Sequence, residues 1–275
     1  MTRLTVKQVL NNNAPLIPRL ECEILLAFVL QQTRTFLYTH QETILQPKQL
    51  TQFNHLRSQR QYGIPIAYLI GKKEFWSLPF LVNEATLIPR PETELLVEQT
   101  LNLLPQECPA RILELGTGSG IIALALASER PHWRIDACDI SESALQIAKK
   151  NQQSLGINNV EFIASDWYSH VPNTERYDAI VSNPPYIAES DPHLLEGDLI
   201  FEPRHALASG PVGLDALEKI IRESLARLKK NGLLLLEHGY DQKLQVTDFM
   251  QQTGYHDICT WKDLQGHDRV TVGYH

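Results

Sequence analysis

The sequence predicts an α/β fold in which a small N-terminal helical bundle precedes a doubly wound, mostly parallel sheet with an antiparallel hairpin at one edge. Three observations predict it. Apolar residues recur at helical spacing over residues 1–72, strand-like and helix-like segments alternate over residues 89–275, and two strand-like segments near the end are separated by a few polar residues. Alternating strands and helices form parallel sheets that are covered by helices.

The length and composition are typical of a globular protein with one large domain or two unequal ones. The chain has 275 residues, of which 43% are hydrophobic and 21% are charged, so a sizeable core is available. Its formal net charge is −7. Because non-specific affinity for nucleic acid comes mainly from clustered Lys and Arg, direct nucleic-acid binding is not expected.

The cysteines and the N-terminus indicate a cytoplasmic protein. The four cysteines are far apart and form no CxxC pair, which argues against both a zinc site and a disulfide framework, so no metal is expected. No signal peptide precedes the first helical segment, and no apolar stretch has the length that spans a bilayer. Reduced thiols, and no membrane contact, are therefore expected.

Residues 1–72 are predicted to form the helical bundle, and residues 73–88 a β-hairpin linker. Pro18 suits the first turn of a helix. In the linker, two strand-like segments flank Ser77-Leu78-Pro79. One apolar stripe of the bundle consists of Leu20, Ile24, Leu25, Phe28 and Val29.

Residues 89–275 are predicted to form the sheet domain. A helix over 91–104 begins with acidic residues, which favour the N-terminal end of a helix dipole. Ser141 and Gly156 suit the start and end of a helix over 141–154, and a long helix is predicted over 214–230. The predicted parallel strands are 111–115, 133–138, 160–163, 177–182 and 233–237. The predicted edge pair is 256–261 and 269–274.

A glycine-rich loop follows the first strand of this sheet and precedes a helix, a position where a nucleotide can approach the backbone. The loop consists of Gly116, Thr117, Gly118, Ser119 and Gly120. Ile121 excludes the dinucleotide pattern G-x-G-x-x-G, and the phosphate loop of NTPases is absent. The remaining pattern, E-x-G-x-G-x-G, resembles the first motif of the Rossmann-like S-adenosylmethionine-dependent methyltransferases. A plain tight turn is the alternative.

Asp139, Asp166 and Trp167 support a nucleotide-like cofactor. Asp139 ends the second strand about 20 residues after the glycines, where a carboxylate can accept from both ribose hydroxyls. Asp166 can accept from an adenine amine, while Trp167 packs on the ring or supplies a backbone N–H. A helix cap for Asp139 and a surface loop for the other two are the alternatives. Their order after successive strands favours S-adenosyl-L-methionine as the cofactor.

Asn183, Pro184, Pro185 and Tyr186 directly follow the predicted strand 177–182. Pro184 restricts Asn183 to extended backbone, so the Asn183 side-chain oxygen and the Pro184 carbonyl can each accept one proton of a planar NH2 group. The Tyr186 ring offers a flat face to that group. If strand 177–182 lies beside strand 111–115, Asn183 faces the glycine loop across the crevice of the sheet.

Five segments together resemble the HemK/PrmC peptide chain release factor glutamine methyltransferases. They are the stretch from Leu87 to Glu94, the glycine loop, the Asn-Pro-Pro-Tyr segment, the stretch from Phe201 to Arg204, and the stretch from Glu237 to Tyr240. The segment from Pro65 to Gly71 also resembles the domain junction of that family. The chain departs from the family pattern at two positions, where His238 replaces an aliphatic residue and Ser77 replaces a glycine.

The resemblance implies a Rossmann-like class I methyltransferase domain over residues 89–275. It implies methyl transfer from S-adenosylmethionine to the glutamine of a Gly-Gly-Gln loop in class 1 peptide chain release factors, which the helical bundle helps to hold. The glycine loop, Asp139, Trp167 and Asn183 would contact the cofactor, and Asn183–Tyr186 the glutamine. Arg90, Pro91 and Glu92 either line the pocket or start a helix, whereas Glu237 and His238 are expected to be structural.

Two other functions remain open. An adenine or guanine amino-methyltransferase that acts on DNA or RNA would use the same glycine loop and Asn-Pro-Pro-Tyr segment, and the acidic charge counts weakly against it. A non-catalytic S-adenosylmethionine-binding protein would keep the glycine loop, but the complete Asn-Pro-Pro-Tyr segment argues against it.

Overall fold

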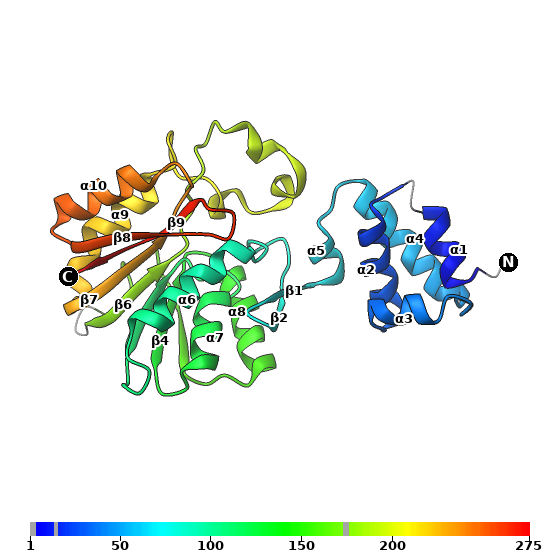
Figure 1. Cartoon of the computed structure of the whole chain (residues 1–275), viewed down its shortest axis with the longest axis horizontal. Coiled ribbons are helices and arrows are strands. Elements are labelled where there is room, and N and C mark those ends of the chain that lie inside the picture. The colour runs from blue at the N-terminus through cyan, green and yellow to red at the C-terminus, as the bar shows by residue number, and fades with distance from the viewer. Residues whose placement is uncertain (1–3, 14–15, 173–175) are drawn as a thin grey trace. The chain divides into compact units, whose positions relative to one another are not determined.

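The computed structural model describes residues 4–13, 16–172 and 176–275. The chain divides into two compact units, Met1–Gly71 and Lys72–His275, which Figure 1 traces from the blue helices to the red C-terminal strand. Within the described ranges, no helix is both long and apolar enough to cross a membrane.

The first unit is a helical bundle around a hydrophobic core. The predicted stripe on its second helix is wrong in part, because Leu20 and Phe28 are 51% and 39% exposed. The buried face instead repeats at Cys22, Leu25, Leu26 and Val29, which also has the i, i+3, i+4, i+7 spacing of one helix face. The helices are α1 (Val6–Asn13), α2 (Arg19–Leu30), α3 (Arg34–Thr39), α4 (Pro47–Gln61) and α5 (Ile66–Ile70).

The second unit contains a seven-stranded sheet with the order β5-β4-β3-β6-β7-β9-β8. The first five of these strands are parallel, and β9 is antiparallel to both of its neighbours. The predicted fold class, a doubly wound sheet with an antiparallel edge, is confirmed. The strands are β3 (Arg111–Leu115), β4 (Arg134–Asp139), β5 (Val160–Ala164), β6 (Tyr177–Ser182), β7 (Leu228–Glu237), β8 (His256–Lys262) and β9 (Asp268–Tyr274).

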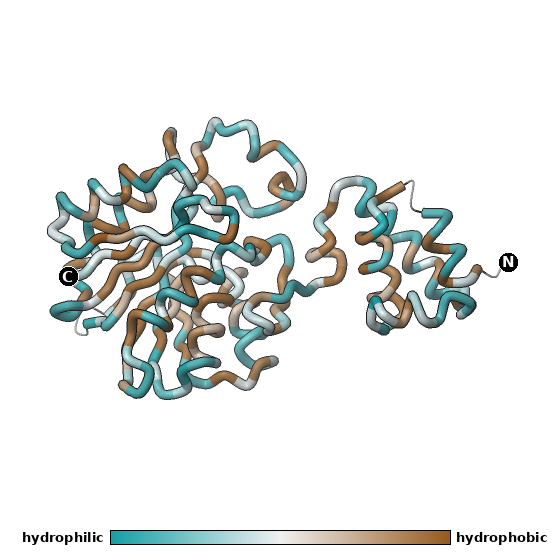
Figure 2. Tube along the Cα trace, viewed as in Figure 1, coloured by the Kyte–Doolittle hydropathy of each residue, from teal (hydrophilic) through white to brown (hydrophobic). Residues whose placement is uncertain are grey.

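Helices cover both faces of this sheet (Figure 1). Ile112 packs in one core and Leu113 in the other, since successive side chains of a strand point to opposite faces. Figure 2 shows the corresponding concentration of hydrophobic residues along the central strands. The α-helices of this unit are α6 (Glu94–Leu103), α7 (Ile121–Glu129), α8 (Glu142–Leu155), α9 (Asp215–Ser224) and α10 (Lys243–Thr253). The 3-10 helices are η1 (Pro91–Thr93), η2 (Pro192–Leu195), η3 (Gly197–Phe201), η4 (Arg204–Ala206) and η5 (Leu225–Arg227).

A two-stranded hairpin opens the second unit, with β1 (Lys72–Phe75) antiparallel to β2 (Leu78–Leu81). Its two-residue turn places Trp76 and Ser77 at φ angles of 51° and 58°, as a type I′ turn requires. The Asn151 side chain connects this hairpin to the glycine loop, because its amide group donates to both the Leu81 and the Ser119 carbonyls. The hairpin therefore supports the loop that was predicted to bind a cofactor.

The predicted helix over 214–230 is wrong at its end. Helix α9 ends at Ser224, and β7 already begins at Leu228. Leu228 is buried and pairs with Tyr177 of β6. Pairing within the sheet therefore determines the conformation here, although the sequence pattern alone favoured continuation of the helix.

Candidate active site

The carboxyl ends of β3, β4 and β6 meet at one edge of the sheet. Leu115, the last residue of β3, pairs with Cys138 of β4 on one side and with Ser182 of β6 on the other. The predicted adjacency of the strands that end at Leu115 and Ser182 is thus confirmed. Asp139 and Asn183 consequently lie on either side of the glycine loop, at the switch point where parallel sheets bind ligands.

The glycine loop is held by the backbone and side chains of β4. The N–H groups of Gly116 and Thr117 both donate to the Cys138 carbonyl at 2.9 Å. The Gly118 N–H donates to Asp139 Oδ2 at 2.8 Å. Gly116 and Gly118 have φ angles of 72° and 56°, in the left-handed region that glycine adopts without steric cost. The glycines therefore allow the sharp turn of the loop, and the hydrogen bond to Asp139 holds its backbone in place.

Glu114, a buried glutamate in β3, supports the glycine loop. Glu114 Oε2 accepts hydrogen bonds from the Thr117 hydroxyl at 2.7 Å and from the Ala123 N–H at 2.9 Å. Oε1 has no hydrogen-bond partner among the described residues. Burial raises the pKa of Glu114 to about 8, because a charged carboxylate is costly in a low-dielectric interior.

A cavity of about 250 Å³ lies beside the loop, and we call it the glycine-loop cavity. Thr117 and Ser119 do not line it, since their side chains are buried, and Gly120 caps α7 instead. A Cβ at Gly120 would come within 3.1 Å of Leu124, so this glycine allows the helix to pack closely. The predicted residues that line the cavity are Gly116, Gly118, Asp139, Asp166, Trp167 and Asn183.

Trp167 forms one wall of the glycine-loop cavity in an unusual backbone conformation. Its φ angle is 48°, which is strained for a bulky residue. Its carbonyl accepts a hydrogen bond from Ser165 Oγ at 2.8 Å, which holds that conformation. A Cβ at Gly116 would lie 3.7 Å from the Trp167 ring, so ring and loop face each other closely. Asp166 is paired with Lys219 at 3.3 Å.

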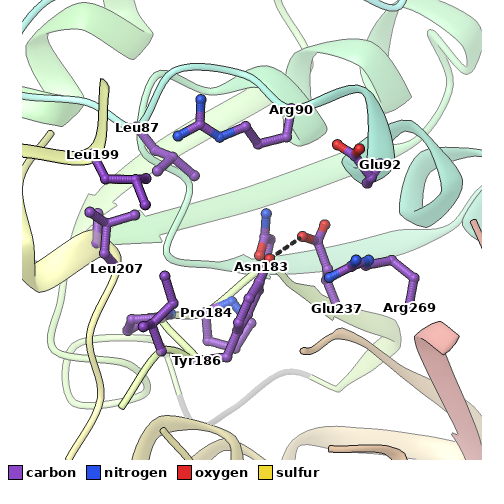
Figure 3. A pocket seen from close by; sticks show the side chains of 13 residues that line it. Leu87, Arg90, Glu92, Asn183, Pro184, Tyr186, Leu199, Leu207, Glu237 and Arg269 are labelled. Atoms are coloured by element: carbon purple, nitrogen blue, oxygen red, sulfur yellow. Dashed lines mark hydrogen bonds between the residues drawn. The ribbon is translucent and has the colours of Figure 1, made fainter. Parts of the chain in front are cut away.

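A second cavity, of about 260 Å³, is lined by all four predicted residues of the Asn-Pro-Pro-Tyr segment (Figure 3). We call it the Asn-Pro-Pro-Tyr cavity. Leu87, Asn183, Pro185 and Ala206 line both cavities. Asn183 therefore lies where a ligand on the glycine loop and a ligand on the Asn-Pro-Pro-Tyr segment would meet.

Asn183 has a defined orientation in this wall. Its Nδ2 donates to Thr93 Oγ1 at 3.0 Å, and Thr93 is fully buried at the end of η1. Because the amide nitrogen is engaged, the side-chain oxygen is the group that Asn183 can offer to a ligand as an acceptor. Thr93 was not among the residues singled out from the sequence.

Tyr186 is anchored by a buried glutamate. Its hydroxyl donates to Glu237 Oε1 at 3.2 Å, so the ring is fixed as a wall of the cavity. Burial raises the pKa of Glu237 to about 7, and the neighbouring Thr93 hydroxyl, Arg269 and Tyr186 act against this rise. Burial also raises the pKa of Tyr186 well above its ordinary value. Glu237 and Arg269 both line the cavity.

Sequence reasoning missed Glu237 as a cavity residue, although one signal was available. Glu237 ends β7, the strand beside β6, just as Asp139 ends β4. An acidic residue at the carboxyl end of a predicted inner strand is a candidate ligand group. By contrast, His238 is fully buried, and its ring nitrogens form hydrogen bonds with the Gly239 carbonyl and the Thr271 hydroxyl. His238 lines neither cavity.

Two of the three residues Arg90, Pro91 and Glu92 line the Asn-Pro-Pro-Tyr cavity. Arg90 and Glu92 do so, whereas Pro91 begins η1 and is exposed. Arg90 forms an ion pair with Glu202, whose other oxygen accepts from the Ile88 N–H at 3.0 Å. Glu202 thereby ties the segment around Arg90 to the segment that follows η3, and both segments border the cavity.

Comparisons with known proteins identify similar sequences over nearly the whole chain. Residues 5–71 match the PrmC N-terminal domain, and residues 91–253 match the Methyltransferase small domain. The chain is 46% identical over 254 residues to the release factor glutamine methyltransferase of Shewanella oneidensis, covering 92% of this chain and 88% of that protein. It is 48% identical over 256 residues to the protein of the same name from Escherichia coli K12, covering 93% and 92%.

Solved structures show the same fold at lower identity. A methyltransferase from Pyrococcus furiosus aligns with a TM-score of 0.56 and 17% identity, covering 80% of this chain and 98% of that one. The hMettl16 catalytic domain, solved in complex with the MAT2A 3′UTR hairpin 6, aligns with a TM-score of 0.58 and 16% identity, covering 79% of this chain and 81% of that one.

Proposed function

The chain belongs to the release factor glutamine methyltransferases, and we propose that it transfers a methyl group from S-adenosyl-L-methionine to the side-chain amide nitrogen of the glutamine in the Gly-Gly-Gln motif of class 1 peptide chain release factors. The observation that carries this proposal is the position of Asn183 in the walls of both cavities. One cavity has the groups that suit the cofactor, and the other has the groups that suit a planar amide.

The residues of the glycine-loop cavity fit S-adenosylmethionine. A Cβ built on Gly118 would meet nothing within 4 Å, so a ligand can lie directly against this backbone. Gly116 and Gly118 of the loop would hold the cofactor, with Asp139 accepting from its ribose hydroxyls and Trp167 packing on its adenine. When bound, the cofactor supplies an electrophilic methyl group on a sulfonium.

The Asn-Pro-Pro-Tyr cavity suits the side-chain amide of glutamine. Asn183 Oδ1 and the Pro184 carbonyl would each accept one N–H of the amide, while the Tyr186 ring lies against its plane. Because Thr93 holds the nitrogen of Asn183, the oxygen is presented without rearrangement. Two acceptors on the N–H groups both aim the nitrogen and increase its electron density.

Orientation is the main contribution that these residues make to catalysis. The lone pair of an amide nitrogen is delocalised, so it reacts only when it is directed at the methyl group. Holding the reactants in line converts a bimolecular step into an effectively unimolecular one. Leu87, Pro185 and Ala206 line both cavities, and their apolar side chains would displace water from the path between the two bound reactants.

The helical unit is the part of the chain that we expect to bind the protein substrate. We assign to the helical unit, which matches the PrmC N-terminal domain, a role in holding the release factor. Exposed apolar side chains such as Leu20 and Tyr62 are available for such a contact.

All four cysteines are free thiols, which agrees with a cytoplasmic location of this protein.

A methyl-transfer assay with three candidate substrates tests this function. The protein is incubated with S-adenosylmethionine carrying a labelled methyl group, and with recombinant release factor, DNA and RNA in separate reactions. Label on the release factor alone is expected. Label on nucleic acid but not on a Gly-Gly-Gln peptide would instead identify a nucleobase methyltransferase, and cofactor binding without transfer to any substrate would identify a non-catalytic binding protein.

A further inference from the structure

Glu237 is a buried carboxylate in the lining of the Asn-Pro-Pro-Tyr cavity. It is 1% exposed, its Oε1 accepts from the Tyr186 hydroxyl, and its Oε2 has no hydrogen-bond partner among the described residues. An unsatisfied buried carboxylate oxygen is costly, so it requires an explanation. Figure 3 shows this carboxylate directed to the same part of the cavity as Asn183.

The strand register places Glu237 beside Asn183. Leu236 of β7 pairs with Ser182 of β6 in parallel register, and Glu237 and Asn183 are the next residue on each chain segment. Neighbouring strands lie about 4.8 Å apart, so the two residues begin from adjacent backbone positions. Thr93, which accepts from Asn183, is also close enough to act on the pKa of Glu237.

Methylation of an amide nitrogen releases a proton that the cavity must accept. The nitrogen forms a bond to the methyl carbon, the bond from that carbon to sulfur breaks with its electron pair going to sulfur, and the nitrogen must then lose one N–H proton. The two proposed acceptors, Asn183 Oδ1 and the Pro184 carbonyl, are amide oxygens and are too weakly basic to keep it.

The other charged groups that line the cavity are less suited to this role. Arg90 and Arg269 are cations that pair with Glu202 and Asp263. Glu92 is only partly buried, so water can solvate its carboxylate. Glu237 alone in the described lining combines a carboxylate, nearly complete burial and an oxygen without a partner.

We propose that Glu237 is a catalytic residue whose carboxylate takes the proton from the glutamine nitrogen as the methyl group is transferred, with the electron pair of the N–H bond returning to nitrogen. This inference rests on the proposed function. Glu237 becomes a neutral carboxylic acid and then returns its proton to solvent when the product leaves.

The surroundings of Glu237 suit a proton acceptor near neutral pH. Burial and the nearby Glu92 raise its pKa to about 7, while Thr93, Arg269 and Tyr186 oppose the rise. A raised pKa makes the carboxylate a stronger base, and general bases work best with a pKa near the operating pH. Activity should therefore be lost as the pH falls below about 7, because Glu237 is then protonated.

The test is the Glu237→Gln variant, which keeps the size of the side chain. With a Gly-Gly-Gln peptide as substrate, kcat is expected to fall about 100-fold, as for loss of a general base. In the wild type, kcat should rise with pH through about 7 and then level off, and the variant should lose this dependence. Glu161→Gln, at an exposed position on β5, is the matched control and should behave as the wild type.

Two further measurements do not depend on turnover. Binding of the peptide in the presence of S-adenosylhomocysteine should change less than about threefold in Glu237→Gln, whereas a merely structural role would weaken it more. NMR titration of carboxyl-labelled glutamate should show one group that titrates near pH 7 in the wild type and is missing from the variant.

Unchanged turnover in Glu237→Gln, or an ordinary glutamate titration, would overturn the inference while leaving the proposed function intact. A wild-type protein that does not methylate the peptide would instead count against the proposed function.

Discussion

Asn183 Nδ2 donates a hydrogen bond to the buried hydroxyl of Thr93 at 3.0 Å, and this contact fixes which end of the Asn183 amide is available as an acceptor. Asn183 follows β6 and Thr93 ends η1, so two segments 90 residues apart in sequence together orient one side chain.

Replacement of Asn183 by Ala should reduce turnover far more than it weakens cofactor binding. The amide nitrogen of the substrate loses one of its two acceptors and its alignment, and kcat should fall about 100-fold. Steady-state kinetics with a Gly-Gly-Gln peptide and calorimetry with S-adenosylmethionine measure the two effects. A loss of cofactor affinity as large as the loss of kcat would contradict the assigned role.

Replacement of Thr93 by Val should reduce turnover about tenfold through Asn183, when turnover is measured well above the Glu237 pKa of about 7. At such a pH, loss of the Thr93 hydroxyl does not change the ionisation of Glu237. Valine keeps the shape of threonine but removes the acceptor, so the amide of Asn183 can rotate and present its nitrogen. In the double variant with Asn183→Ala, the Thr93→Val change should have little further effect on kcat. Additive losses would show that Thr93 acts by another route.

Replacement of Asp139 by Ala should weaken cofactor binding by about tenfold or more, because hydrogen bonds to a carboxylate are stronger than neutral ones. The change also removes the acceptor of the Gly118 N–H. Calorimetry measures the loss, and kcat at saturating cofactor should stay within about threefold of the wild type. An unchanged dissociation constant would show that Asp139 only caps the adjoining loop.

The stability of the wild type should fall as the pH rises, in part because of Glu114. Its pKa is about 8 in the folded protein and near the ordinary glutamate value of about 4.3 in the unfolded chain. Between these values the folded state holds the proton more strongly, so the free energy of unfolding decreases with pH.

The Glu114→Gln variant tests this account of stability, since it cannot ionise. Between about pH 6 and pH 8, its melting temperature without ligand should decline less than that of the wild type. Differential scanning calorimetry at several pH values measures both. Parallel declines would contradict the raised pKa.

Much of the site could be predicted because its residues directly follow strands. Asp139 and Asn183 come at the ends of apolar segments that the sequence marks clearly, and parallel strands bring their carboxyl ends to one edge. The order of the glycine loop, Asp139 and Trp167 along the chain was therefore sufficient to group them into one cavity.

The remaining features depend on contacts that a sequence pattern does not encode. Whether Glu237 reaches the cavity depends on the register of β7 against β6, and β7 begins earlier than its pattern indicates. The role of Thr93 depends on where η1 packs, and the buried face of α2 was placed wrongly because two apolar stripes have the same helical spacing.

The acceptor atom of the methyl group can be located by mass spectrometry. Recombinant class 1 release factor is incubated with the protein and S-adenosylmethionine, digested, and analysed by tandem mass spectrometry, beside a factor whose Gly-Gly-Gln glutamine is replaced by alanine. We expect one methyl group on the side-chain nitrogen of that glutamine and none on the altered factor. Methylation at another residue, or of nucleic acid only, would contradict the proposed function.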